Sequence, residues 1–152
     1  MSGANQPGQL HYLDSSVVLT YLLEEREDLQ VLNGISDVAS SRLLWTEVSR
    51  SIHRALQTQR LTPEEATKVR HTFEILAKGI SQITLGESVL RRADGPYPIV
   101  IRTLDAIHLA SAEIWLREFD SDLPWSAMSV WSLDERMNQC AAQLGYSTPM
   151  LR

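Results

Sequence analysis

The stretch LHYLDSSVVLTYL (residues 10–22) decides the fold class, because a strand pattern changes there to a helix pattern within a few residues. Leu10–Leu13 is a short apolar run of strand length. Ser15 and Ser16 are residues that commonly begin a helix, and helical apolar spacing starts at Val17. A strand followed directly by a helix is the unit from which parallel sheets are built, so this stretch predicts an α/β protein.

The same alternation of strand and helix patterns continues along the rest of the chain. Further strands are predicted at Asp37–Ser40, Ile80–Leu85 and Ser126–Trp131, and helices at Glu27–Leu32, Leu43–Gln59, Pro63–Lys78, Glu87–Ala93, Thr103–Phe119 and from Leu133 to Leu144. Tyr146–Met150 is expected to add an edge strand, and Asp94–Pro98 a loop. This order predicts an α/β fold of three layers, with a central, mostly parallel sheet covered by helices on both faces.

Two helices carry specific signals for the residue at which they begin. Thr62, Pro63 and Glu65 have the spacing of a capping box with proline in the first helical position. Ser132 and Glu135 have the same spacing before the last helix, so a second capping box is predicted there.

Composition places the sequence among globular proteins rather than disordered or fibrous ones. Its 152 residues suit one domain, and 43% are hydrophobic against 22% charged. We expect a flexible leader over residues 1–9, which lack the basic and apolar parts of a signal peptide, and a single domain over residues 10–152. The single cysteine, Cys140, excludes an intramolecular disulfide. No apolar run reaches the roughly 20 residues that cross a bilayer, so we expect a cytoplasmic protein.

The charge balance restricts how the protein could act on nucleic acid. The formal net charge is −5 and the pI is about 5.3, whereas nonspecific nucleic-acid binders are usually basic. Carboxylates gathered at one site repel phosphate until a divalent cation neutralises them. A nucleic-acid enzyme with this composition would therefore need a metal ion.

Four acids fall where a parallel sheet would place a functional site. Asp14 and Asp134 each follow a predicted strand, Glu47 lies early in the helix after the second strand, and Asp105 lies in the first turn of the long central helix. Ligands of such sheets bind beyond the carboxyl ends of the strands. All four acids therefore map to the same rim of the sheet.

Each of these acids also has an ordinary structural interpretation. Asp14 could cap a helix, Asp105 and Asp134 could complement helix dipoles, and Glu47 could pair with Arg50. Taken together they favour a metal site. Isolated carboxylates in such apolar surroundings cost several kcal/mol each unless a charge compensates, and Mg²⁺ prefers carboxylate oxygens.

At these positions the sequence resembles the PIN-domain family, especially the VapC-type toxins of bacterial toxin–antitoxin pairs. The matching pieces are LDSSV (13–17), WTEV (45–48), RTLDAIHLA (102–110) and SLDERM (132–137), followed by AA (141–142) and LG (144–145). They occur in the family's order and span nearly the whole chain, and the third piece is the most specific.

The resemblance implies a Mg²⁺- or Mn²⁺-dependent endoribonuclease that acts as the toxin of a type II toxin–antitoxin system. Asp14, Glu47, Asp105 and Asp134 would be both its catalytic and its metal-binding residues, and Ser16 would help to shape the metal site. The family also implies an RNA substrate, a homodimer and inhibition by a small antitoxin of the VapB type. One or two metal ions would orient a water for in-line attack on a phosphodiester.

Other residues have weaker links to this chemistry. Arg50 and Arg54 share a helix face with Glu47 and are candidates for substrate binding, although a solvated basic face explains them equally well. Arg102 is a weaker candidate of the same kind. His108 follows Asp105 by three residues and could reach the site, but a hydrogen-bonded structural histidine is the favoured interpretation.

Three alternatives remain open at this stage. A haloacid-dehalogenase-like phosphatase would need a second aspartate where Ser16 stands, and a receiver module would need a lysine late in the sheet, whereas Lys68 and Lys78 both lie in one helix. The third alternative is a PIN-fold protein that acts mainly by binding a partner and has little or no nuclease activity. RNA cleavage with and without a chelator distinguishes it from the nuclease.

Overall fold

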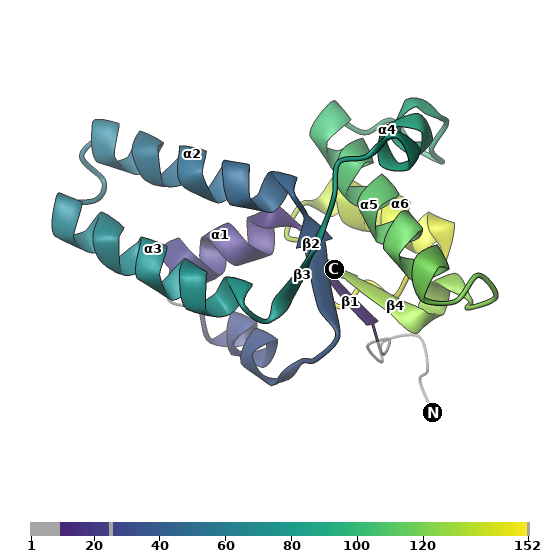
Figure 1. Cartoon of the computed structure of the whole chain (residues 1–152), viewed down its shortest axis with the longest axis horizontal. Coiled ribbons are helices and arrows are strands. Elements are labelled where there is room, and N and C mark those ends of the chain that lie inside the picture. The colour runs from purple at the N-terminus through teal and green to yellow at the C-terminus, as the bar shows by residue number, and fades with distance from the viewer. Residues whose placement is uncertain (1–9, 25, 152) are drawn as a thin grey trace.

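Four parallel strands form the centre of the structure (Figure 1), a computed structural model that describes residues 10–24 and 26–151. The strands are β1 (Leu10–Leu13), β2 (Val38–Ser41), β3 (Ile80–Ile83) and β4 (Met128–Trp131). Their order across the sheet is β3-β2-β1-β4, so the first strand of the chain lies between the second and the last. The predicted parallel sheet is confirmed, whereas the predicted leader, residues 1–9, lies outside the described residues.

Helices cover both faces of this sheet, as the sequence predicted. They are α1 (Ser15–Leu23), α2 (Leu43–Gln57), α3 (Pro63–Ala77), α4 (Glu87–Asp94), α5 (Thr103–Phe119) and α6 (Glu135–Leu144), with 3₁₀ helices at Glu27–Gly34 and Trp125–Ala127. Figure 1 shows α1, α2 and α3 on one side of the strands and α4, α5 and α6 on the other. The fold is therefore a three-layer α/β sandwich.

The sheet separates two hydrophobic cores. Successive side chains of a strand point to opposite faces, so Tyr12 of β1 packs with Leu109 of α5, whereas its neighbour Leu13 packs with Val48 of α2. All four residues of β1 are buried, as they are in β2 and β4. Burial on both faces explains why Leu10–Leu13 is a short, largely apolar run without a polar face.

Two of the predicted helix termini can be compared directly with the structure. Thr62 and Glu65 form the predicted capping box at the start of α3, where each side chain accepts a hydrogen bond from the other residue's backbone N–H. The second predicted capping box, Ser132 with Glu135, is wrong. Asp134 caps α6 instead, because its Oδ1 accepts from Met137 N at 2.8 Å, while the Ser132 hydroxyl is engaged elsewhere.

Some predicted strand bounds also differ from the structure, and β3 ends at Ile83 rather than Leu85. β4 begins at Met128 rather than Ser126, because Trp125–Ala127 forms a 3₁₀ turn. The predicted edge strand Tyr146–Met150 is reduced to a single parallel bridge between Ser129 and Ser147. Pro149, two residues further on, has no N–H to donate, so the pairing does not extend beyond that bridge. No helix in the described part of the chain is long and apolar enough to cross a membrane.

Candidate active site

The four acids line one cavity of about 560 Å³ at the carboxyl ends of β1 and β4. The other lining residues used below are Ser15, Ser16 and Arg102. Asp14 follows β1 and Asp134 follows β4, and these strands are neighbours in the sheet. The backbone N–H of Asp14 donates to the carbonyl of Trp131 at 2.9 Å, which fixes the two strand ends side by side.

Hydrogen bonds from two hydroxyl groups, and not helix capping, orient the side chain of Asp14. It precedes α1 as the N-cap residue, yet its side chain makes no capping hydrogen bond. Its Oδ2 accepts from Ser16 Oγ at 2.6 Å and from Ser132 Oγ at 2.8 Å. Ser16 Oγ also accepts from Leu133 N at 2.9 Å, so this serine connects Asp14 to the loop before α6. These bonds orient a carboxylate that is only 4% exposed.

Glu47 reaches the cavity from α2 and is bound at both oxygens. Its Oε1 lies 2.7 Å from His108 Nε2, and its Oε2 accepts from Ser15 Oγ at 2.9 Å. The ion pair with Arg50 that the sequence also allowed is not what holds it. Burial acts to raise the pKa of Glu47, but the hydrogen bond and charge of His108 outweigh burial and lower that pKa. Glu47 is therefore ionised at neutral pH.

His108 connects two of the acids to the core. Its Nε2 lies 3.7 Å from Asp14 Oδ1 in addition to its contact with Glu47, and its Nδ1 lies 2.7 Å from the Tyr12 hydroxyl. The Tyr12 oxygen accepts from Ser41 N at 3.1 Å. Because an ionised carboxylate can only accept, Nε2 must carry a hydrogen and donate it to Glu47. Burial acts to lower the pKa of His108, but the bond to Glu47 and the nearby acids raise it.

The sequence predicted part of this arrangement of His108 and the acids. The three-residue spacing after Asp105 suggested that His108 could reach the site, but the favoured interpretation was a structural histidine. The structure shows a histidine that is hydrogen-bonded, buried and in contact with the acids at once. Tyr12 was missed. Its available signal was its place two residues before Asp14, on the β1 face toward α5.

Asp105 and Asp134 form the other side of the cavity, and the exposed Arg102 contacts both of them. Its Nε is 3.4 Å from Asp105 Oδ2 and its Nη2 is 3.1 Å from Asp134 Oδ2. Burial is the main cause that raises the pKa of Asp105, and the charges of Asp134 and Asp14 raise it further, against the opposing effect of Arg102. Arg102, the N-cap residue of α5, thus supplies a positive charge to an acid that lies 32 positions further along the chain.

The donor set suits a hard divalent cation, although the side chains are not already gathered around one position. In residues 10–24 and 26–151, no three histidine, cysteine, aspartate or glutamate side chains lie close enough together to hold a metal ion as they stand. Carboxylate oxygens are nevertheless the ligands that Mg²⁺ and Mn²⁺ prefer. Burial is the main cause of the raised pKa of Asp105, and the charges of Asp134 and Asp14 add a repulsion that such a cation would relieve.

The two arginines predicted to bind substrate do not line this cavity. Arg50 lines a separate cavity between α2 and α3, together with Arg42 and Arg70. Arg54 lines a third cavity that also contains Arg60. Although both lie on α2, they face different spaces and therefore do not act as one phosphate-binding pair beside the four acids.

Comparison with known proteins agrees with this geometry. The family profile described as PIN domain matches residues 11–137, which include all four acids. The chain belongs to the PIN domain family. This PIN domain is also similar to "Ribonuclease VapC47" of Mycobacterium tuberculosis (strain CDC 1551 / Oshkosh), with 26% identity over 144 residues that cover 90% of this chain and 93% of the relative. The family resemblance stated from the motifs is thus confirmed, and the phosphatase and receiver alternatives are not supported.

Proposed function

We propose that this PIN domain is a metal-dependent endoribonuclease and the toxin of a type II toxin–antitoxin pair. The observation that carries the proposal is that four acids, distant along the chain, line one cavity at the carboxyl ends of neighbouring strands. The similarity to a relative named as a ribonuclease of the VapC type supports the same activity. A PIN protein that only binds a partner would have no need for this cluster of mutually repelling charges.

Asp14, Glu47, Asp105 and Asp134 would hold Mg²⁺ or Mn²⁺, with Ser16 keeping Asp14 in place. A divalent cation bound there supplies the positive charge that activates a water and stabilises the phosphate during hydrolysis. Asp14 and Glu47 are acceptors whose orientation the protein already fixes through Ser16, Ser132, Ser15 and His108. Their fixed orientation reduces the reorganisation needed when the cation binds.

Arg102 has a different part in this mechanism. Its side chain is 79% exposed, so its contacts with Asp105 and Asp134 are solvated and cost little to break. With Asp105 and Asp134 serving as metal ligands, the Arg102 guanidinium would be free to bind the RNA phosphate at the mouth of the cavity. It would thereby hold the substrate backbone beside the acids.

The remaining parts of the proposal concern partners and organisation. RNA would be the substrate, a small antitoxin of the VapB type would inhibit the enzyme, and the toxin would be a cytoplasmic homodimer with one PIN domain over residues 10–152. Similarity to a VapC-type ribonuclease supports the antitoxin and the RNA substrate. Of the two arginines first considered for substrate binding, only Arg50 retains a structural argument, which is given below.

RNA cleavage tests the proposed function directly. Wild type, Asp14→Asn and the control variant Glu118→Gln, an exposed acid on α5 outside the cavity, would be assayed with Mn²⁺ or Mg²⁺ and with EDTA. We expect cleavage by wild type and by the control, cleavage at least about 100-fold slower by Asp14→Asn, and none in EDTA. Activity that survives both the chelator and the substitution would end the metal-nuclease proposal. Failure of the wild type to cut any RNA offered would favour the partner-binding alternative.

A further inference from the structure

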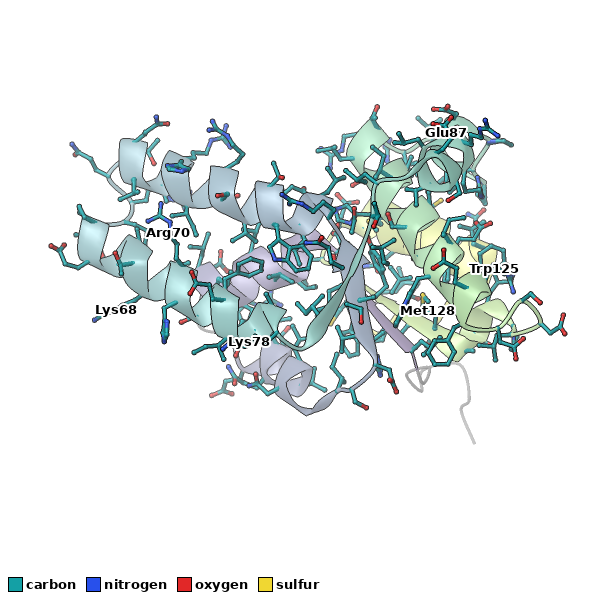
Figure 2. The ribbon with its side chains drawn as sticks, in the orientation of Figure 1. Lys68, Arg70, Lys78, Glu87, Trp125 and Met128 are labelled. Atoms are coloured by element: carbon teal, nitrogen blue, oxygen red, sulfur yellow. The ribbon has the colours of Figure 1, made fainter. Side chains whose placement is uncertain are left out.

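A second cavity, of about 600 Å³, lies between α2 and α3 and is strongly basic. We call it the basic cleft and define it by Arg42, Trp45, Arg50, His53, Arg70 and Phe73. Figure 2 shows Arg70 extending from α3 into the space between α3 and α2. Glu74 is the one acid among the lining residues, so three arginines outnumber it in a chain whose net charge is −5.

The arginines of the basic cleft are not used by the protein's own acids. In the described part of the chain, the side chains of Arg42, Arg50 and Arg70 make no ion pair, and the guanidinium of Arg42 donates one long hydrogen bond of 3.4 Å to Thr46. Lys68 of α3 and Lys78 at the end of α3 do not line the cleft. Three arginines that line one cleft without ion pairs repel one another, and Glu74 offsets only part of their charge, so an anionic ligand would stabilise them.

Aromatic rings form the apolar part of the basic cleft. Trp45 and Phe73 pack edge to face with ring centroids 5.9 Å apart, and Trp45 keeps part of its surface accessible. A row of cations beside an accessible aromatic surface is the combination with which proteins hold single-stranded nucleic acid, because phosphates and bases alternate along the strand. An acidic peptide would use the arginines but would leave the aromatic surface without a matching group.

The basic cleft and the acid cavity share the first turns of α2. Thr46 and Val48 line the cleft, whereas Glu47, the residue between them, lines the acid cavity. An α-helix with its side chains is about 10 Å across, so a strand leaving the acid cavity reaches the cleft by crossing one helix. The two cavities are therefore placed to hold consecutive parts of one extended RNA.

We propose that the basic cleft binds the single-stranded RNA next to the scissile phosphate, with Arg50 and Arg70 neutralising its backbone. This inference rests on the proposed function, because it takes RNA as the substrate. It also explains why Arg50 lies outside the acid cavity. Arg50 would bind the RNA phosphate next to the one that is cleaved.

The test compares two double variants that remove the same charge from the same region. Arg50→Gln with Arg70→Gln loses two cations of the cleft, and Lys68→Gln with Lys78→Gln loses two cations outside it. Both are made in an Asp14→Asn background, and a short, unstructured, fluorescein-labelled RNA is titrated by anisotropy at several KCl concentrations. For the arginine variant we expect about tenfold weaker binding and a salt slope smaller by about 1 to 1.5, as for two lost phosphate contacts. The lysine variant should bind like its parent.

Several results would overturn the proposal. Equal affinity and equal salt slope in the two double variants would show that the basic cleft does not contact RNA. Unchanged RNA binding together with lost binding of a poly-glutamate peptide would assign the cleft to an acidic protein segment instead. Circular dichroism checks that both variants are folded, which we expect because neither arginine makes an ion pair among the described residues.

Cleavage kinetics separate this inference from the proposed function. With Asp14 intact, the arginine variant should show a raised KM and a nearly unchanged kcat, since it loses binding away from the reacting atoms. If wild type cleaves RNA and the arginine variant does so with the same KM, the cleft inference fails and the nuclease stands. If RNA binding depends on the arginines but wild type cleaves nothing, the nuclease proposal fails and the cleft stands.

Discussion

The two sides of the acid cavity are built in different ways. The inner pair, Asp14 and Glu47, is bound by serine hydroxyls and by a histidine that is 1% exposed. The outer pair, Asp105 and Asp134, is bridged by an arginine that is 79% exposed. The pKa of Glu47 is lowered, whereas that of Asp105 is raised. One side thus stabilises its negative charge within the fold, while the other leaves it only partly compensated.

This difference shows how a protein can hold carboxylates in position for a ligand without pairing all of them in strong internal salt bridges. A buried, hydrogen-bonded carboxylate needs little rearrangement when a ligand arrives. A solvated arginine contact is weak and can be exchanged. We therefore expect substitutions in the inner pair and its partners to be costly, and substitutions around the outer pair to be tolerated by the fold.

The largest effect is expected for Asp14→Asn. The substitution removes a charge but keeps an oxygen that can accept from Ser16 or Ser132, so the fold should be retained. RNA cleavage measured under single-turnover conditions should fall on the order of 10²–10³-fold or more, the usual result of deleting one group that stabilises the transition state. A variant that unfolds, or one that cleaves at the wild-type rate, would contradict the distinction between charge and orientation drawn for the inner pair.

The next largest effect is expected at His108, where two substitutions separate its two hydrogen bonds. His108→Asn should lower the free energy of unfolding by about 3 kcal/mol, because it leaves the charge of Glu47 without its buried partner. His108→Gln should cost clearly less, since the longer amide can still donate toward Glu47. Urea unfolding measures both. Equal losses in the two variants would mean that the donor to Glu47 is not the important group.

The same pair predicts a pH dependence of stability. The contribution of Glu47, whose pKa is lowered on folding, is present above its ordinary value of 4.5 and is lost as pH falls through the folded value. The pKa of His108 is raised on folding. Its contribution to stability is therefore fully present below pH 6.5 and is lost as pH rises through the pKa that His108 has in the folded protein. Stability in EDTA should therefore decline on the alkaline side of 6.5, and His108→Gln should remove that decline. A decline that persists in the variant would locate its cause elsewhere.

A smaller effect of opposite sign is expected at the outer pair. Asp105→Asn removes a charge that the fold disfavours, so the Tm in EDTA should rise by a few degrees, while cleavage is lost. Thermal unfolding followed by circular dichroism gives the first result and the RNA assay the second. A lowered Tm would indicate that the contact of Asp105 with Arg102 matters more than its repulsion by Asp134.

The smallest effect on stability is expected for Arg102→Gln, within about 1 kcal/mol, since both of its ion pairs are solvated. Because the arginine competes with a cation for Asp105 and Asp134, Mn²⁺ should bind a few-fold more tightly to the variant. Paramagnetic resonance of Mn²⁺ measures this affinity without any RNA. Weaker Mn²⁺ binding would mean that Arg102 organises the outer pair and does not compete for it.

The sequence predicted the positions of the acids well because a simple rule of parallel sheets applied. Residues that follow β1 and β4 lie at the same edge, so Asp14 and Asp134 could be placed there without knowing their contacts. The sequence could not predict the chain of hydrogen bonds from Tyr12 through His108 to Glu47, since its members come from β1, α5 and α2. Side-chain partners of this kind depend on packing across the sheet, which spacing does not encode.

Local signals also competed with one another. Ser132 carries the spacing of a helix cap, but Asp134 is the better placed acceptor for Met137 N, and Ser132 donates to Asp14 instead. Arg102 was only a weaker candidate for substrate binding, yet the start of α5 brings its side chain within 3.1 Å of Asp134. In both cases a long-range contact decided the outcome between two locally acceptable arrangements.

The placement of β1 between β2 and β4 has a consequence for synthesis of the protein. Leu10 pairs with Met128, so β1 can form hydrogen bonds along its second edge only after β4, residues 128–131, has been synthesised. Asp134 joins Asp14 only when that pairing is complete. Until residues 128–134 have been synthesised, the acid cluster is therefore divided, and under the proposed function a shorter nascent chain lacks a complete active site.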